Sequence, residues 1–407
     1  MINCFTDRQT DRQTDRQTDR QTDRQTDRQT DRQTDRQTDR QTDRQTDRVI
    51  EYSVLRALVM ILVVVGHCTY YTIAGPSEYG GIDYAGTMKA EGVMDTHVHA
   101  WASVLTMFIY TFHMPLFMAI SGAVFELGWH KGKYRDSAIF VKKKIRRLLV
   151  PFFGVTLFYA VPLKYLSGYW HESSDVLRDI FIGQILVQGN THLWFLMTLF
   201  CEFLIFYFFL RHGVLEKRYQ YILFVILLLT CFVAKKVPIK LISYVLEFGI
   251  YFYVGMLFER YRKVINAHVA LRWVIALLLL WSILFVLHHG LAHPSSFVLK
   301  GIKRLDEIVM AFIGMMTFYG GMVLALRKQM LTGKWVSLLS RDSMGIYLYS
   351  DPLNYVILAG FAVIFSIAGF GSEFLSAALY SVRLILTFFG GLAVTLMIRY
   401  LSHQIKF

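Results

Sequence analysis

The stretch Tyr52–Ala74, YSVLRALVMILVVVGHCTYYTIA, is an apolar run long enough to cross a lipid bilayer as one helix. Two polar residues interrupt it, Arg56 and His67, at positions eleven residues apart. On a helix this spacing is about three turns plus 20°, so both side chains project from nearly the same face, about 16 Å apart along the axis. A cation and an imidazole inside one span are costly unless they face protein or water, which indicates a buried polar site. A snorkelling arginine and a packed histidine fit the spacing equally well.

Composition extends the membrane interpretation to the whole chain. Of 407 residues, 54% are hydrophobic and 15% are aromatic, and the mean hydropathy is +0.39. These values are typical of polytopic membrane proteins rather than of soluble domains. The formal net charge of +13 is expected in cytoplasmic loops and near membrane lipids, so we predict no nucleic-acid partner. The four cysteines lack metal-ligand spacing, so we predict neither a disulfide framework nor a metal site.

We therefore predict an all-α, polytopic integral membrane protein with about ten transmembrane helices, preceded by a disordered repeat tract. The tract covers residues 1–48 and the membrane domain residues 49–407. The candidate spans are 52–74, 103–125, 148–168, 192–210, 219–235, 240–258, 272–289, 306–326, 345–367 and 377–399.

Loop charge sets the predicted orientation. Loop 126–147 carries eight lysines and arginines, whereas loop 75–102 is mainly acidic. By the positive-inside rule, both termini are expected in the cytoplasm. Two short outer loops, 236–239 and 290–305, disagree because basic residues flank or occupy them. The outer stretch 176–187 is amphipathic, so we expect it to lie on the outer surface or to dip inward as a lid.

Residues Thr6–Arg48 repeat Thr-Asp-Arg-Gln with a strict period of four. Eleven aspartates and eleven arginines cancel and no hydrophobic residue occurs, so the tract is predicted to be disordered. The codons GAC-AGA-CAG-ACA encode Asp-Arg-Gln-Thr and are successive copies of the tetranucleotide GACA. We hypothesise that the tract is a translated microsatellite whose slippage gives phase-variable expression. An ordinary low-complexity tail is the alternative.

The second span contains His113, Pro115, Ser121 and Gly122 within the sequence FHMPLFMAISG. Pro115 is expected to kink the helix and free a carbonyl, and Gly122 to permit close contact between helices. His113 is interpreted either as a site residue or as a packing residue that caps the freed carbonyl, and the packing role is favoured.

Other ionisable and aromatic residues each have two interpretations. Lys143, Arg146 and Arg147 form a basic cluster that suits either a polyphosphate-bearing substrate or topogenic charge and anionic lipid. His192 and Trp194 open the fourth span, where interfacial positions are common. Acids inside spans are rare and mostly functional, and each is able to orient an imidazole or pair with an arginine such as Arg383. They are Glu202, Glu247 and Asp351. Histidines near outer loops are interpreted as surface residues: His97, His99, His288, His289 and His293.

Together these segments resemble the acyltransferase type 3 family, bacterial inner-membrane O-acyltransferases with about ten spans. Over residues 49–401 the resemblance is carried by Arg56-x10-His67, Phe-His-Met-Pro-Leu-Phe with Ser121-Gly122, Arg147-Leu-Leu-Val-Pro-Phe, His192-Leu-Trp-Phe-Leu and Gly345-Ile-Tyr-Leu-Tyr. Family members acetylate or succinylate hydroxyls of lipopolysaccharide, exopolysaccharide, periplasmic glucans and nodulation factors.

The resemblance implies an enzyme of the bacterial inner membrane that moves an acyl group, most simply acetyl from acetyl-CoA, to a hydroxyl of a cell-surface carbohydrate such as lipopolysaccharide. His67 matches the family's essential histidine, as general base or transient acyl carrier, and Arg56 matches its partner. Acyl-CoA is the expected donor substrate, reached from the cytoplasm, and no tightly bound cofactor is expected. The expected partners are a glycan or glycolipid acceptor from the outer side and glycan-assembly proteins. The predicted substrate-binding residues are Arg146, Arg147, Lys143, His113, Ser121, Trp194 and Glu202.

Two positions depart from the family pattern. Ser350 stands where many members have a histidine, and Lys143 with Arg147 matches only partly the paired arginines of some members. Two other classes share the general features. A transporter or flippase for a glycan or lipid-linked intermediate equally suits ten spans with buried ionisable residues, but it consumes no acyl-CoA. A non-catalytic scaffold of a glycan-assembly complex predicts that His67 and Arg56 tolerate substitution.

Overall fold

The structure, a computed structural model, describes residues 49–69, 78–215, 219–290, 296–331 and 333–404. The repeat tract, and with it the prediction of disorder, lies outside these residues. Residues 1–50 and 51–407 form separate units, and the architecture below is that of the second unit.

The described residues are mostly helical and contain no β-strand. The elements are α2 (Ile50–Cys68), α3 (Tyr84–Ala90), α4 (His97–Tyr110), α5 (His113–His130), α6 (Ser137–Lys144), η1 (Ile145–Leu149), α7 (Val150–Val155), η2 (Thr156–Ala160), α8 (Val161–Leu166), α9 (Val176–Asp179), η3 (Ile180–Ile185), α10 (Trp194–Arg211), α11 (Gln220–Ala234), α12 (Lys240–His268), α13 (Leu271–Gly290), α14 (Phe297–Arg327), α15 (Lys334–Phe365), η4 (Ile367–Gly371) and α16 (Glu373–Gln404).

The predicted all-α, polytopic fold is confirmed. Nine helical segments in the described ranges are long and apolar enough to cross a membrane. The remaining predicted span, 219–235, corresponds to α11, whose 15 residues fall short of the roughly 20 that cross a bilayer core. Several helices extend beyond the boundaries of the predicted spans. The third begins at Ser137 instead of residue 148, because a helix continues through polar residues that hydropathy alone assigns to a loop.

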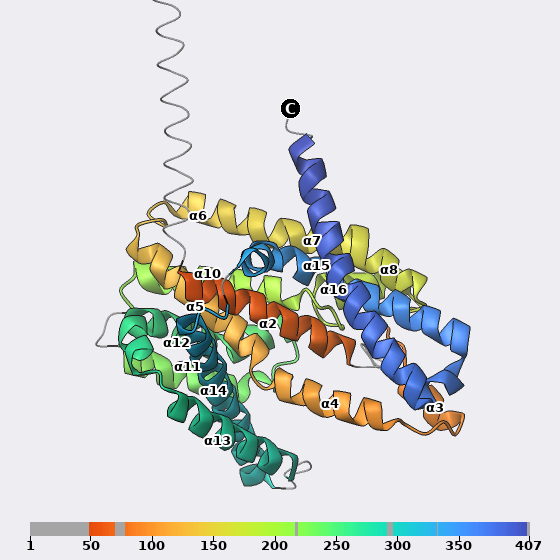
Figure 1. Ribbon diagram of the computed structural model, residues 1–407. Helices are drawn as coiled ribbons and strands as arrows, with labels where there is room; N and C mark the ends of the chain where they lie inside the picture. Colours follow the sequence, from red (N-terminus) through yellow and green to blue (C-terminus); the bar gives the residue numbers. More distant parts are fainter. Residues whose placement is uncertain (1–48, 70–77, 216–218, 291–295, 332, 405–407) are drawn as a thin grey trace, which may run out of the picture. The chain divides into compact units, whose positions relative to one another are not determined.

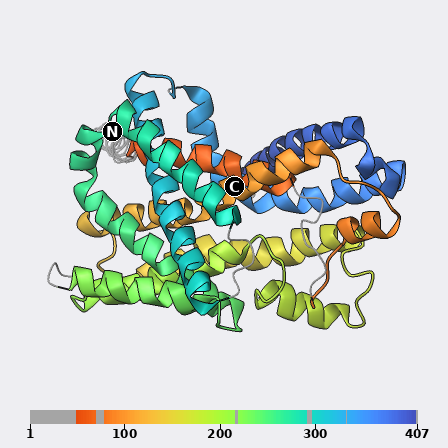
Figure 2. The same ribbon diagram turned by 90° about the horizontal axis from the view of Figure 1, so that it is seen from below.

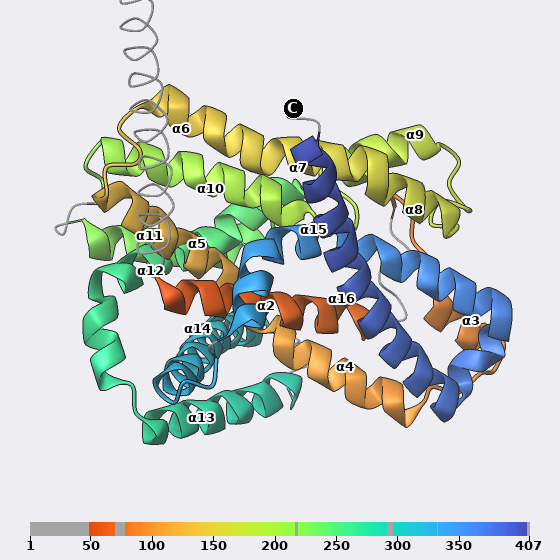
Figure 3. The same ribbon diagram turned by 45° about the horizontal axis from the view of Figure 1, so that its top comes forward.

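Helix α2 occupies the middle of the membrane domain. Ten of its 19 residues are buried, so it is enclosed by protein over much of its surface. In Figure 3 the first part of α2 lies between α5 and α14, and α4 and α16 lie near its other end. Helices α15 and α16 pack side by side (Figures 1 and 2), as do α13 and α14. The stretch that carries Arg56 and His67 is therefore a central helix.

Helices α5 and α12 pack closely at a pair of glycines. A Cβ atom on Gly122 would overlap the carbonyl oxygen of Phe252, and one on Gly255 would overlap the carbonyl oxygen of Ala119. The backbones of the two helices therefore touch, as small residues allow in membranes. The predicted role of Gly122 in close helix contact is confirmed.

The third predicted span is one continuous helical run that contains two π-helical turns, η1 and η2. Each turn ends just before a short helix with proline as its second residue, Pro151 after η1 and Pro162 after η2. Proline lacks an N–H and its ring crowds the carbonyl one turn back, so a wider turn accommodates it. Pro151 lies in the first turn of α7, but the run itself begins 14 residues earlier, at Ser137.

The second span is broken rather than kinked. Helix α4 ends at Tyr110 and α5 begins at His113, so the interruption precedes Pro115, which occupies the first turn of α5. The amphipathic stretch 176–187 forms α9 and η3. Leu177 and Phe181 are exposed, whereas Gln184 is buried, so one face of this segment packs on the membrane domain.

Candidate functional site

The centre of the site is an imidazole–carboxylate pair between α2 and α15. His67 lies one residue before the end of α2, and its Nδ1 atom is 2.7 Å from Oδ1 of Asp351. The His67 side chain is 19% exposed and that of Asp351 only 4%. The carboxylate is therefore withdrawn from solvent while the imidazole reaches open space. A carboxylate only accepts hydrogen bonds, so it holds the proton on Nδ1 and leaves the Nε2 lone pair for substrate.

A second imidazole lies against the same carboxylate. Nδ1 of His192 is 3.3 Å from Oδ2 of Asp351, but without hydrogen-bonding geometry. Its Nε2 atom is 3.2 Å from the carbonyl oxygen of Leu348, to which it donates. The hydroxyl of Tyr347 donates to the carbonyl of His192 and fixes the backbone there. Asp351 thus orients His67, while His192 closes the far side of the pair.

A buried polar layer supports the end of α2. Arg383 of α16 is fully buried and donates from Nη2 to the carbonyl oxygen of His67 at 3.1 Å. Its Nε atom donates to Oδ1 of Asn354 at 3.1 Å. Asn354 lies one turn beyond Asp351 on α15. Arg383 and Asn354 therefore link α16 and α15 to the backbone of the residue that carries the imidazole.

A buried lysine holds the loop that leads to His192. Lys164 of α8 donates from Nζ to the carbonyl oxygen of Asn190 at 2.6 Å and to Oε1 of Gln184 at 2.9 Å. Its ammonium group also lies over the rings of Tyr169 and Tyr355, at 4.6 and 4.9 Å from their centroids. Desolvation of the ammonium group is offset by these partners. Lys164 therefore fixes the backbone on one side of the site.

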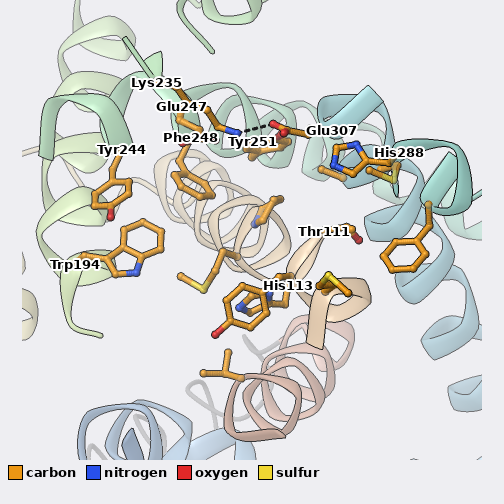
Figure 4. Close-up of a pocket in the computed structure, with 18 of the residues that line it drawn as sticks. Thr111, His113, Trp194, Lys235, Tyr244, Glu247, Phe248, Tyr251, His288 and Glu307 are labelled. Atoms are coloured by element: carbon orange, nitrogen blue, oxygen red, sulfur yellow. Dashed lines mark hydrogen bonds and ion pairs between the residues drawn. The ribbon is translucent and has the colours of Figure 1, made fainter. Parts of the chain in front are cut away.

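Two cavities meet at His67. The larger has a volume of about 520 Å³ and extends past His113 and Trp194 to Lys235 and Glu307 (Figure 4). The smaller, about 210 Å³, is lined by Asp351 and by residues of the Asn190 loop. Residues common to both are His67, Tyr110, His192, Trp194 and Tyr244. Both cavities therefore border the same imidazole.

Two of the predicted substrate-binding residues border the larger cavity. His113 is buried and its Nδ1 atom lies 3.0 Å from the carbonyl oxygen of Ile109, in the break between α4 and α5. That carbonyl also accepts the N–H of Phe112. The carbonyl four residues before Pro115 is that of Thr111, so His113 does not cap the carbonyl that Pro115 frees. His113 packs in its own helix end and lines the cavity as well. Trp194 is the first residue of α10 and packs against Tyr244 of α12, with ring centroids 4.4 Å apart.

The other predicted site residues lie away from His67. Arg56, predicted to be catalytic together with His67, is three turns back along α2, outside both cavities. The three basic residues of the cluster are exposed on α6 and η1: Lys143, Arg146 and Arg147. Ser121 donates to the carbonyl oxygen of Phe117 in its own helix at 2.9 Å. Glu202 is buried on α10, and its Oε1 atom has no hydrogen-bond partner among the described residues.

The sequence alone assigned no partner to Asp351. Lys164 and Asn354 were not among the predicted site residues. Lys164 had a usable signal, because a lysine within an apolar helix is expensive and rarely without a role. Asn354 follows Asp351 by three residues, which places both on one helix face. His288, interpreted as a surface residue, instead lines the larger cavity and pairs with Asp306 at 2.9 Å.

The described part of the chain contains no cluster of three or more His, Cys, Asp or Glu residues arranged for a metal ion. No match is found among curated proteins or among solved structures. One family matches, under the description "Acyltransferase domain", over residues 49–401. That range covers the helices of the membrane domain except the last three residues of α16, and all residues of the imidazole–carboxylate site. The chain belongs to the acyltransferase type 3 family, and it is a multi-pass membrane acyltransferase.

Proposed function

We propose that the protein is an inner-membrane O-acetyltransferase that moves acetyl from acetyl-CoA to a hydroxyl of a cell-surface carbohydrate. The main support is the pair formed by His67 and Asp351, with 2.7 Å between Nδ1 and Oδ1, beside two open cavities. Acyl transfer to a hydroxyl uses such a histidine, because a base must remove the hydroxyl proton. A transporter would not consume acyl-CoA, so donor turnover by the purified protein separates the two classes.

The proposed step uses His67 as a general base. Nε2 of His67 accepts the proton of the acceptor hydroxyl as its oxygen attacks the thioester carbonyl carbon. The C–O bond forms, the C–S bond breaks, and the coenzyme A thiolate takes up the proton. Asp351 stabilises the imidazolium that forms in between, since it accepts the Nδ1–H hydrogen bond at 2.7 Å.

The two cavities favour direct transfer of the acyl group from donor to acceptor. The alternative is a mechanism in which His67 carries the acyl group in between. Both cavities border His67, so donor and acceptor have room beside it together. Direct transfer predicts a ternary complex and sequential initial-rate kinetics, whereas an acyl carrier gives ping-pong kinetics. Measurement of initial rates with both substrates varied distinguishes the two. A parallel-line pattern would assign the carrier role to His67.

Substitution of the base tests the proposal. His67→Ala is expected to lower the acetylation rate by at least about 10²-fold, because the proton acceptor is lost while cavity and fold remain. Acetylation is measured by mass spectrometry of surface glycans from a deletion strain that carries wild type or variant. His97→Ala is the matched control, because that exposed imidazole lies outside both cavities. Undiminished acetylation in the His67 variant, with normal membrane insertion, would remove His67 from the mechanism.

We also propose that expression is phase-variable, since gain or loss of one GACA unit would shift the reading frame of the membrane domain. The support is the strict four-residue period of Thr6–Arg48. The gene is expected to contain an unbroken GACA array whose length varies among clones of one strain. Mixed codons for Asp, Arg, Gln or Thr would contradict slippage.

A further inference from the structure

The larger cavity carries an aromatic surface that acid–base chemistry does not require. Trp194 of α10 faces Tyr244 and Phe248 of α12, at centroid distances of 4.4 and 5.1 Å and interplanar angles of 34° and 39°. Figure 4 shows Trp194 and Tyr244 together on one side of the cavity. Trp194 and Tyr244 also border the smaller cavity at His67. The surface therefore begins beside the proposed base and extends outward.

An ion-pair rim closes the far end of the same cavity. Arg304 of α14 lies 2.8 Å from Glu247 and 2.6 Å from Glu307, measured from Nη2 and Nη1 to the nearest carboxylate oxygens. Lys235 lies 2.6 Å from Glu307, the pair marked in Figure 4. Two cations thus face two carboxylates, and their formal charges cancel. The carboxylates retain lone pairs, and Lys235 retains N–H donors, for a ligand.

We propose that this part of the cavity binds the acceptor, as a neutral sugar ring stacked on Trp194 and Tyr244 with its hydroxyls directed to the rim. The C–H groups of a pyranose face suit the electron-rich face of an aromatic ring. Alternating carboxylate and cationic groups suit hydroxyls, which both donate and accept. The volume of about 520 Å³ lies within the range of about 300–1,000 Å³ of small-ligand sites. This inference rests on the proposed acetyltransferase function and specifies its acceptor class.

The charged residues of the cavity favour a neutral sugar over the acyl-CoA donor and over a lipid. A polyphosphate requires uncompensated cations, and here Arg304 and Lys235 are both paired. An acyl chain favours an apolar groove, whereas this one has four charged residues at its end. A neutral glycoside is the ligand class that uses both the aromatic surface and the balanced rim.

Binding of simple glycosides to the detergent-solubilised full-length protein tests the inference. The probes are methyl α-D-glucoside, methyl α-D-mannoside and methyl α-D-galactoside, observed by saturation-transfer NMR. At least one is expected to bind through its ring C–H protons, and Trp194→Ala is expected to weaken that binding about tenfold. Trp335→Ala is the control, because this exposed tryptophan lies outside the cavity. No binding to the wild type, or equal binding to the Trp194 variant, would overturn the proposal.

A substitution in the rim provides a second test, in which binding of an acidic sugar is expected to become tighter. Glu307→Gln leaves Lys235 and Arg304 without their shared carboxylate, so the variant is expected to bind methyl β-D-glucuronide at least about fivefold more tightly than wild type. If this variant does not insert, Lys235→Met is used, and it is expected to weaken glucuronide binding more than neutral glycoside binding, because both ligands lose an N–H donor but only the glucuronide loses an opposite charge. Tighter binding of glucuronide than of neutral glycosides to the wild type would assign an acidic sugar instead and overturn the proposal.

These measurements need no acyl donor and no turnover, so they separate the inference from the proposed function. His67→Ala is expected to keep glycoside binding while it loses acetylation. If glycoside binding depends on Trp194 but the His67 variant acetylates normally, only the proposed role of His67 is contradicted, and the sugar-binding inference stands.

Discussion

At the level of single residues, the site depends on one carboxylate whose two oxygens face different histidines. Oδ1 of Asp351 holds Nδ1 of His67 at 2.7 Å, whereas Oδ2 lies 3.3 Å from His192 without hydrogen-bonding geometry. Sequence analysis identified His67 because an imidazole in an apolar helix stands out, and it noted that Asp351 is an acid inside a span. The pairing itself depends on the packing of α2 against α15, which no local pattern encodes.

Asp351→Asn is expected to lower kcat by about 10²- to 10⁴-fold with little change in KM for either substrate. An amide no longer stabilises the imidazolium, and its N–H group favours the wrong imidazole tautomer. Steady-state kinetics of purified protein measure the effect. Asp342→Asn is the matched control, a buried carboxylate on the same helix that pairs with Arg341 and Arg399 instead. Equal losses in kcat per folded molecule for the two variants would indicate a structural role for Asp351.

At the level of helices and loops, the site is assembled by contacts of two kinds. The glycine pair brings the backbones of α5 and α12 together, and Lys164 fastens the Asn190 loop. Gly122 was predictable because small residues mark helix contacts in membranes. The partner of Lys164 was not predictable, because it accepts through a backbone carbonyl whose position depends on the course of a loop.

Gly122→Ala is expected to destabilise the membrane domain by about 1–3 kcal/mol, because the added methyl group overlaps the Phe252 carbonyl and forces α5 away from α12. Thermal unfolding of the detergent-solubilised protein, followed by size-exclusion chromatography, measures the loss. Gly154→Ala is the control, since a Cβ atom there meets no neighbour within 4 Å. A Gly122 variant as stable as the Gly154 variant would contradict the close contact.

Lys164→Met is expected to loosen the loop before His192 and to lower activity without preventing insertion. The substitution leaves the Asn190 carbonyl and the Gln184 side chain without their donor, at a cost of about 1–3 kcal/mol to local stability. Hydrogen–deuterium exchange over residues 186–192 measures the loosening, and Lys89→Met, an exposed lysine of α3, provides the control. Unchanged exchange in that loop would show that Lys164 does not hold it.

For the whole molecule, the ion-pair rim explains part of a conflict in the charge pattern. The loops 236–239 and 290–305, which are predicted to face outward, carry or adjoin basic residues, contrary to the positive-inside rule. In the structure Lys235 pairs with Glu307, and Arg304 pairs with Glu307 and Glu247, in a cavity that continues to His67. Two of the apparent exceptions are thus compensated charges of a site. A count of loop residues misses this because the compensating acids lie on α12 and α14.

The proposed orientation therefore still follows from the basic segment 126–147, and it is testable by cysteine labelling. In a background with Cys4→Ser and Cys201→Ser, which removes the partly exposed native thiol, Ala85→Cys on α3 is expected to react with a membrane-impermeant maleimide in intact spheroplasts. Ser137→Cys, at the start of α6, is expected to react only after permeabilisation. Both positions are exposed, whereas Cys68 and Cys231 are buried, so labelling reports the side of the membrane. The opposite labelling pattern would invert the protein and place the sugar-binding part of the cavity on the cytoplasmic side, where a surface glycan acceptor would have to be modified before export.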